Sequence, residues 1–365
     1  MPRALSVTFV VMAGGRGERL WPLVRAAMPK VCLSPEGSRS LLRMTIDRLR
    51  PVWPLAEWLI VTTQEQAGAV RASLPSALRR RVLVEPRGKN TAACITLAAV
   101  ALAARDPTRV MVVVPADHWI GEERAFQAAV RAAIQAAVRE EAIVTIGVRP
   151  THAHVGLGYL CAGAPVSTGP GPRVFRLARF IEKPSLATAR RLIARPKTFW
   201  NSGNFVGMAD TFLRHITEWL PEHTRRLVPL ARLFSGRHAP SGRGRVFSRQ
   251  VDAAYRTLAG ISFDHGVMDH LHDGLVVEGR YRWADLGSWD VWARLGQRSA
   301  SALSYDSPNV TVVGGEDHLV ATVGVRDLVV VHTPSATLIC HPDRAQAVRE
   351  IVRRVYTEPR FARYR

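Results

Sequence analysis

Apolar and polar positions divide the first 150 residues into two kinds of segment. Short, nearly continuous apolar runs predict buried strands at 7–12, 58–62, 81–84, 110–114 and 142–148. Between them, apolar residues recur at three- and four-residue spacing, which predicts helices at 40–49, 65–74, 90–104 and 122–140. Strands that are apolar on both faces and alternate with helices indicate a mostly parallel sheet covered on both sides. We therefore predict a doubly wound α/β fold.

The pattern changes after residue 150. Strands at 159–162 and 174–180 and a helix at 186–194 are predicted, and a segment rich in Gly, Pro and Arg at 236–245 is interpreted as an exposed loop. Short strands follow at 310–313, 319–323, 328–332 and 337–340, before a final helix near 344–356. We therefore predict a large domain of residues 1–298 and a small β-rich unit of residues 299–365, in which no hexapeptide repeat is evident.

Composition narrows the class of protein. The chain has 365 residues, of which 47% are hydrophobic, but no apolar run approaches the roughly 18 residues of a membrane span. The N-terminal apolar stretch runs into a charged loop and has no cleavage site typical of a signal peptide. The four cysteines, Cys32, Cys94, Cys161 and Cys340, form no C-x-x-C pair, which favours neither zinc nor a disulfide framework. We expect a cytoplasmic protein with no membrane partner.

The formal charge of +20 raises the question of nucleic-acid binding. The basic residues are scattered and belong to no known nucleic-acid motif, so we expect no nucleic-acid partner. Of the 50 basic residues only four are lysines, and Lys30, Lys89 and Lys183 lie in short segments flanked by Pro or Gly. In a chain that otherwise uses arginine, such lysines indicate sites that need a compact positive charge, although four lysines are too few to exclude chance.

A glycine-rich loop follows the first predicted strand directly. It reads Ala13-Gly14-Gly15-Arg16-Gly17-Glu18-Arg19-Leu20. The sequence is neither a Walker A motif nor a dinucleotide fingerprint. Its glycines let backbone N–H groups converge on an anion, and the two arginines add charge-assisted hydrogen bonds. We therefore predict phosphate binding by residues 13–17, with Lys30 just downstream to reach a leaving pyrophosphate.

Two aspartates each end an apolar, strand-like run. Asp117 follows residues 112–116, and Asp285 lies in Trp283-Ala284-Asp285-Leu286-Gly287. Open α/β sheets bind ligands at the carboxyl ends of their strands. Singly, Asp117 could cap a turn and Asp285 could cap the next helix. Together they predict a Mg²⁺ site, because Mg²⁺ usually takes one or two carboxylates and completes its shell with phosphate and water.

Two further segments carry groups suited to a hydroxyl-rich, phosphorylated ligand. Glu182-Lys183-Pro184 ends a predicted strand and offers a carboxylate for hydroxyls and a cation for phosphate, although it could be a surface turn. Trp200-Asn201-Ser202-Gly203-Asn204 places amide and hydroxyl groups beside an aromatic ring.

Eight segments of the chain resemble, in order, the mannose-1-phosphate guanylyltransferase (GDP-mannose pyrophosphorylase) family of sugar nucleotidyltransferases. They are residues 14–30, Glu85-Pro86-x-x-Lys89-Asn90-Thr91-Ala92, Pro115-Ala116-Asp117-His118, Gly156-Leu157-Gly158-Tyr159, Phe180-Ile181-Glu182-Lys183-Pro184, Trp200-Asn201-Ser202-Gly203, Ser262-Phe263-Asp264 and Trp283-Ala284-Asp285-Leu286-Gly287-Ser288-Trp289. The glycine loop identifies only the broad superfamily, whereas the Asn-Thr-Ala and tryptophan motifs point to the guanylyl branch. Val31 stands where this family usually has Gln, and Leu157 where it commonly has an aromatic residue.

The resemblance implies an enzyme with a Rossmann-like catalytic domain and a β-helix-like C-terminal unit. Mannose 1-phosphate and GTP would give GDP-mannose and pyrophosphate. Residues 13–17 with Arg19 and Lys30 would hold the triphosphate, and Asp117 with Asp285 would hold Mg²⁺. The sugar phosphate would contact Gly158, Glu182, Lys183 and Asn201, and the base or ribose would lie near Glu85, Asn90 and Thr91.

In this interpretation Arg19, Lys30 and Lys183 serve catalysis by neutralising charge. A carboxylate at Glu85 would match the N1–H and N2–H₂ donors of guanine. We expect a homodimer. Two alternatives stay open: a nucleotidyltransferase for another sugar 1-phosphate, of the manno-heptose or glucose type, and a non-catalytic sugar-nucleotide sensor.

Overall fold

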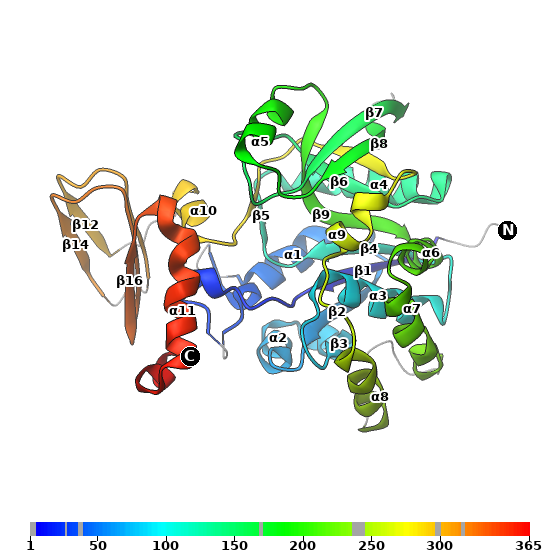
Figure 1. Cartoon of the computed structure of the whole chain (residues 1–365), viewed down its shortest axis with the longest axis horizontal. Helices are drawn as coiled ribbons and strands as arrows, with labels where there is room; N and C mark the ends of the chain where they lie inside the picture. The colour runs from blue at the N-terminus through cyan, green and yellow to red at the C-terminus, as the bar shows by residue number, and fades with distance from the viewer. Residues whose placement is uncertain are drawn as a thin grey trace.

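The computed structural model of the chain has a large α/β body and a smaller β-rich unit, with a helix near the C-terminus between them (Figure 1). The structure describes residues 5–25, 28–35, 39–167, 171–235, 245–295, 301–314 and 318–365, without the side chains of residues 167 and 245–247. Most of the predicted loop at 236–245, and the predicted boundary between residues 298 and 299, lie outside the described residues. Within these ranges, none of the helices combines the length and the apolar character that a membrane span requires.

In the described part of the chain, a nine-stranded sheet in the order β3-β2-β1-β4-β9-β6-β10-β8-β7 forms the centre of the body. Its strands are β1 (Val7–Met12), β2 (Glu57–Thr63), β3 (Val82–Glu85), β4 (Val110–Pro115), β6 (Val144–Val148), β7 (Tyr159–Ser167), β8 (Val174–Ile181), β9 (Thr198–Met208) and β10 (Leu275–Gly279). β1 pairs in parallel with β2 and β4, as continuous apolar strands predict. β9 runs antiparallel between β4 and β6. The predicted α/β class is confirmed, and its second half adds antiparallel strands.

Helices cover both faces of this sheet. They include α1 (Leu41–Leu49), α2 (Ala67–Ser73), α3 (Asn90–Ala103), α4 (Glu123–Glu140), α5 (Leu186–Ile193), α6 (Ala209–Trp219), α7 (Pro221–Leu227), α8 (Arg245–Arg256) and α9 (Phe263–Gly266). Helix α10 (Trp289–Arg294) packs instead against the C-terminal unit. Alternate residues of a strand point to opposite faces. On β1, Phe9 and Val11 therefore pack in one core with α1 and α4, while Val10 packs in another with α3 and α6.

Strand β9 is the main element that the sequence pattern did not indicate. Its polar stretch from Asn201 to Asn204 interrupts the apolar run that would have predicted a strand. In the structure these side chains are buried and paired: Ser202 Oγ donates to the carbonyl of Ile146 at 2.6 Å, and Thr145 Oγ1 donates to Asn201 Oδ1 at 2.9 Å. A buried polar group is stable where it is hydrogen-bonded, so polar residues fit the middle of the sheet here.

The C-terminal unit contains the predicted short strands and is β-rich, as expected. Its strands are β12 (Ala302–Tyr305), β13 (Val310–Val313), β14 (Val320–Val323), β15 (Leu328–Thr333) and β16 (Ala336–Cys340). β12 pairs in parallel with β14, and β13 with β15. Side-chain bonds between the layers, such as Thr322 to Ser304, also join residues 18 positions apart. The backbone therefore stacks one 18-residue coil on the next, which is β-helix geometry without an evident sequence repeat.

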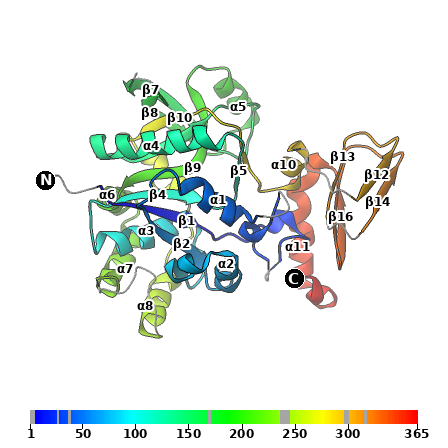
Figure 2. The same ribbon diagram turned by 180° about the vertical axis from the view of Figure 1, so that it is seen from behind.

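Helix α11 (Val348–Thr357) joins this unit to the body. Val348 and Val352 of α11 share a core with Leu20 and Val24 beside the glycine loop and with Trp289 of α10. Seen from behind, α11 stands between the β-rich strands and the N-terminal segments of the body (Figure 2). The C-terminal unit is thus packed on the side of the body that carries the glycine loop.

Candidate active site

The glycine loop leaves β1 and presents free backbone amides. Gly15 and Gly17 have φ values of 127° and 59°, in the left-handed region that favours glycine. Thr62 Oγ1 donates to the carbonyl of Ala13 and Gln66 Nε2 to that of Gly15, both at 2.8 Å, which fixes the loop. None of the hydrogen bonds in the described part of the chain uses the N–H of residues 14–17. Consecutive unpaired amides of this kind form an anion-binding nest.

Lys30 and the two aspartates lie together beside this loop. Lys30 Nζ donates to Asp117 Oδ2 at 2.6 Å and to Asp285 Oδ1 at 2.9 Å. Burial alone would lower the pKa of Lys30, but the two carboxylates raise it. Burial alone would raise the pKa of Asp285, but the Lys30 ammonium, together with His118 and Arg19, lowers that pKa to about 2. Lys30 and Asp285 are therefore both ionised at neutral pH.

A short two-stranded ribbon brings the aspartates together. β5 (His118–Ile120) follows Asp117 directly and pairs antiparallel with β11 (Trp283–Asp285), so that Asp285 stands opposite His118. The predicted convergence of the two carboxylates is present in the structure. His118 packs edge-on against Trp283, and burial lowers its pKa, so the imidazole is neutral at pH 7.

The pair of carboxylates fits a hard divalent cation. Both reach the same ammonium nitrogen, so two anionic oxygens point at one position beside the phosphate loop. Among the described residues there is no cluster of three or more His, Cys, Asp or Glu side chains able to hold a metal ion. Two carboxylates without further protein ligands suit Mg²⁺, which fills its shell with phosphate oxygens and water, better than Zn²⁺.

The two arginines of the loop lie in different places. Arg19 Nη1 donates to Gln346 Oε1 at 2.8 Å, and its charge contributes to the low pKa of Asp285. Arg16 is exposed and pairs loosely with Glu18 at 3.7 Å. Arg19 therefore belongs to the same charge cluster as the aspartate pair, whereas Arg16 extends outward from the loop.

The residues predicted to bind the sugar phosphate form a second cluster. The Asn201 N–H donates to the carbonyl of Gly158 at 2.8 Å, and Lys183 Nζ lies 2.8 Å from Glu182 Oε1. A Cβ on Gly158 would come within 2.7 Å of Glu182 Oε2, so glycine is needed for this close approach. The structure brings all four predicted residues together.

Asp264 also belongs to this cluster, although the sequence analysis assigned it no role. Asn201 Nδ2 donates to Asp264 Oδ1 at 2.6 Å. Burial, together with the neighbouring Glu182 charge, raises the pKa of Asp264 to about 6. Ser262 caps the short helix α9 by accepting the N–H of His265, which holds Asp264 in place. The only available signal was the motif Ser262-Phe263-Asp264 in the family resemblance.

The three residues predicted near the base or ribose differ in accessibility. Asn90 is exposed at the start of α3, with a left-handed φ of 64°. Thr91 Oγ1 accepts the N–H of Phe263 at 2.8 Å and so links α3 to α9. Glu85 is buried, with 4% of its surface exposed; Tyr255 donates to its Oε1 at 3.0 Å, and burial raises its pKa to about 8. In this structure the Glu85 carboxyl therefore faces the core, away from any base in solution.

The aspartate pair and the cluster around Asn201 are neighbours in space. The rings of Trp200 and Trp283 lie 6.5 Å apart, one beside Asn201 and the other two residues before Asp285. A Cβ on Gly203 would lie 3.6 Å from Pro115 and 4.0 Å from His118. Strand β9 thus carries the sugar cluster to the carboxyl end of β4, where Asp117 lies, and one substrate could span both.

The glycine loop, a lysine between two aspartates and an adjacent polar cluster thus lie together on a mixed α/β sheet. The family model described as nucleotidyl transferase matches residues 8–300. A second model, described as a MannoseP isomerase/GMP-like beta-helix domain, matches residues 302–355. The fold and the site define a nucleotidyltransferase.

Relatives show the branch of that class. The mannose-1-phosphate guanylyltransferase of Escherichia coli K12 is 34% identical over 96% of this chain and 74% of its own length. The xanthan biosynthesis protein XanB of Xanthomonas campestris is also 34% identical, over 95% of this chain and 72% of its own. A crystal structure of the Thermus thermophilus protein named mannose-1-phosphate geranyltransferase has a TM-score of 0.81, with 32% identity over 97% of this chain and all of its own. The chain belongs to the mannose-1-phosphate guanylyltransferase family, which confirms the resemblance seen in its motifs.

Proposed function

We propose that this enzyme transfers GMP from GTP to mannose 1-phosphate, giving GDP-mannose and pyrophosphate. The observation that carries the proposal is the position of Asp117, Asp285 and Lys30, which meet between the phosphate loop and the polar cluster around Asn201. The names of the relatives support the choice of nucleotide and sugar.

In this proposal an oxygen of mannose 1-phosphate attacks the α-phosphorus of GTP in line. One P–O bond forms as the bond from the α-phosphorus to the β-phosphate oxygen breaks, and pyrophosphate leaves. The nucleophile is already an anion, so the site needs no general base. The loop amides with Arg19 and Lys30 would bind the triphosphate and neutralise charge on the leaving group, while Lys183 would orient the attacking phosphate.

The sugar would be held by groups that match hydroxyls. Glu182 and Asp264 accept hydrogen bonds, and the amide of Asn201 both accepts and donates. The Asn201 carbonyl oxygen already accepts from Thr145 and from the N–H of Gly203, which fixes its orientation before any ligand binds. A positioned amide of this kind discriminates between hydroxyl configurations, because an unmatched sugar would leave buried polar groups unpaired.

Asp117 and Asp285 are the residues that would hold Mg²⁺. Bound there, the ion would neutralise charge on the nucleotide phosphates and help to align them. The Lys30 ammonium pairs with both carboxylates, and from this position it would add positive charge beside the triphosphate.

Guanine would be selected by the segment that contains Glu85, Asn90 and Thr91. Asn90 and Thr91 lie at an accessible edge, but Glu85 would have to leave Tyr255 before its carboxyl could meet a base. Glu85 as the base reader stays a prediction. Its burial favours a structural role for the side chain and leaves the exposed part of the segment around Asn90 as the surface available to the base.

One assay tests the function directly. Pyrophosphate release is measured with each of four nucleoside triphosphates and a panel of sugar 1-phosphates, with and without Mg²⁺. We expect turnover with GTP and mannose 1-phosphate that disappears when the metal is chelated. Preference for a glucose or manno-heptose phosphate would establish the first alternative, and tight sugar-nucleotide binding without turnover would establish a sensor.

The remaining expectations concern the setting of the enzyme. All four cysteines are free thiols, which fits a reducing compartment, and we propose the cytoplasm. We also keep a homodimer and the absence of a nucleic-acid partner as predictions, to be tested by light scattering and by titration with DNA and RNA.

A further inference from the structure

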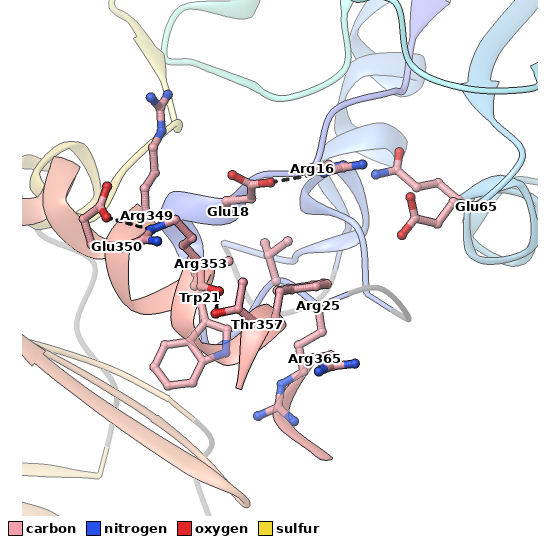
Figure 3. A pocket seen from close by; sticks show the side chains of 14 residues that line it. Arg16, Glu18, Trp21, Arg25, Glu65, Arg349, Glu350, Arg353, Thr357 and Arg365 are labelled. Carbon is pink, nitrogen blue, oxygen red and sulfur yellow. Dashed lines mark hydrogen bonds and ion pairs between the residues drawn. The ribbon is translucent and has the colours of Figure 1, made fainter. Parts of the chain in front are cut away.

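A cavity separate from the aspartate pair lies between the glycine loop and α11. Its volume is about 460 Å³, and Figure 3 shows side chains from the loop and from the C-terminal helix facing each other across it. Five arginines line it: Arg16, Arg25, Arg349, Arg353 and Arg365. Three glutamates also line it, so its formal charge is positive. A cavity of this size with a cationic lining suits a small polyanion.

The arginines of this cavity differ in how far they are already engaged. Arg353 pairs with Glu350 at 3.1 Å, Arg16 pairs with Glu18, and Arg25 donates to hydroxyl groups of the C-terminal unit. For Arg349 the described residues supply neither a hydrogen-bond nor an ion-pair partner. Arg349 is therefore the arginine that can bind a ligand without first giving up a contact.

The glycine loop borders this cavity and is also in close contact with Lys30. A Cβ on Gly17 would lie 2.9 Å from Lys30 Cβ and 3.3 Å from Val24, a residue that lines the cavity. Gln66, which holds the carbonyl of Gly15, lines it as well. A chain of phosphates that lies along the free amides of the loop, with its first phosphate near Lys30, therefore has a cationic space beside its far end.

The C-terminal unit is also hydrogen-bonded to the charge cluster that contains Arg19. Gln346 lies one turn before Glu350, accepts from Arg19 and donates to Ser288 Oγ at 3.3 Å. Ser288 follows the segment that carries Asp285. Hydrogen bonds from Gln346, just before α11, thus reach Arg19 and Ser288, which are far apart in the sequence.

We propose that the cavity between the glycine loop and α11 binds the β- and γ-phosphates of the nucleoside triphosphate, with Arg349 as a direct contact. The C-terminal unit would then be part of the nucleotide site, because it supplies the cation farthest from the α-phosphorus. This inference rests on the proposed function for the identity of the nucleotide, but it makes a separate claim about where a polyphosphate binds.

The test compares the wild-type enzyme with Arg349→Gln and with Arg354→Gln as a matched control. Arg354 lies on the same helix, pairs with Glu358 at 2.7 Å and does not line the cavity. Binding of inorganic pyrophosphate is measured by calorimetry in the presence of Mg²⁺, and KM is measured for GTP and for mannose 1-phosphate. We expect Arg349→Gln to weaken pyrophosphate binding and to raise the KM for GTP, each roughly tenfold, the size of one charge-assisted hydrogen bond. The KM for mannose 1-phosphate should not change.

Wild-type pyrophosphate affinity in Arg349→Gln would overturn the proposal. An equal loss in Arg354→Gln would also overturn it, because the effect would then follow net charge alone. Arg349 is exposed on a helix and Gln is a good helix former, so the variant should fold, which circular dichroism checks. Pyrophosphate binding requires no turnover. A wild-type enzyme that binds pyrophosphate through Arg349 but makes no GDP-mannose would count against the proposed function only.

Discussion

The buried carboxyl of Glu85 predicts a specific dependence of stability on pH. Burial raises its folded-state pKa from 4.5 to about 8, while in the unfolded chain it titrates near its usual value. Between these two values the folded protein holds a proton that the unfolded chain releases. The contribution of Glu85 to stability is therefore fully present below about pH 4.5 and is lost as pH rises through about 8.

The size of the effect follows from the two pKa values. Each pH unit over which the folded chain holds one proton more than the unfolded chain lowers the free energy of unfolding by about 1.4 kcal/mol. Between pH 5.5 and pH 8.0, Glu85 therefore lowers the free energy of unfolding by about 3 kcal/mol. Glu85→Gln removes the titration and keeps the shape of the side chain and an acceptor for the Tyr255 hydroxyl.

The assay is urea denaturation of the wild-type and Glu85→Gln proteins at both pH values, with Glu218→Gln, an exposed carboxyl on α6, as the control. Relative to the wild type, Glu85→Gln should gain about 3 kcal/mol of stability from pH 5.5 to pH 8.0, and the control should gain nothing. The contributions of other titrating groups cancel, because the difference between variant and wild type is compared at the two pH values. An equal difference at the two pH values would show that Glu85 is not held protonated, and our interpretation of its environment would be wrong.

Further predictions concern the site itself. Asp117→Asn and Asp285→Asn should each lower kcat by roughly 100-fold or more without loss of the fold, because each removes one anionic group at the proposed metal position; wild-type-like turnover in both, measured by pyrophosphate release, would refute the metal assignment. Gly158→Ala should raise the KM for mannose 1-phosphate, because its Cβ would come within 2.7 Å of Glu182 Oε2; an unchanged KM would separate Gly158 from the sugar site. Lys183→Ala should raise the same KM roughly tenfold and leave that for GTP unchanged, in steady-state kinetics with each substrate varied; a rise confined to GTP would contradict its role.

Much of the fold could be predicted from the sequence, because the first strands are apolar on both faces and the helices between them are amphipathic. Val110–Pro115 was recognisable for this reason. In the antiparallel half, β7 and β8 were predicted as strands, whereas β9 and β10 were not. β9 has buried polar residues, and the pairing that makes them stable comes from Thr145 and Ile146 on another strand, which no local pattern reveals.

Some site residues could be predicted because the local sequence alone indicates their chemistry, whatever residues lie near them in space. The glycine loop and the two aspartates are of this kind. Asp264 and Gln346 are different, because their importance depends on Asn201 and Arg19, partners contributed by distant segments. Glu85 shows the opposite problem: a carboxylate in a suggestive motif gives no sign of whether its side chain will face a ligand or the core.

The ribbon of β5 and β11 has a consequence for how the enzyme is made. The pairing of three residues of β5 with three of β11 brings Asp285 beside Asp117, although Asp285 is translated much later. A nascent chain that has reached α8 already contains the glycine loop, Lys30 and Asp117, yet it lacks Asp285. If Asp285 is needed for chemistry, as we propose, competence arises only near the end of synthesis of the α/β body, and incomplete chains released from the ribosome would be inert.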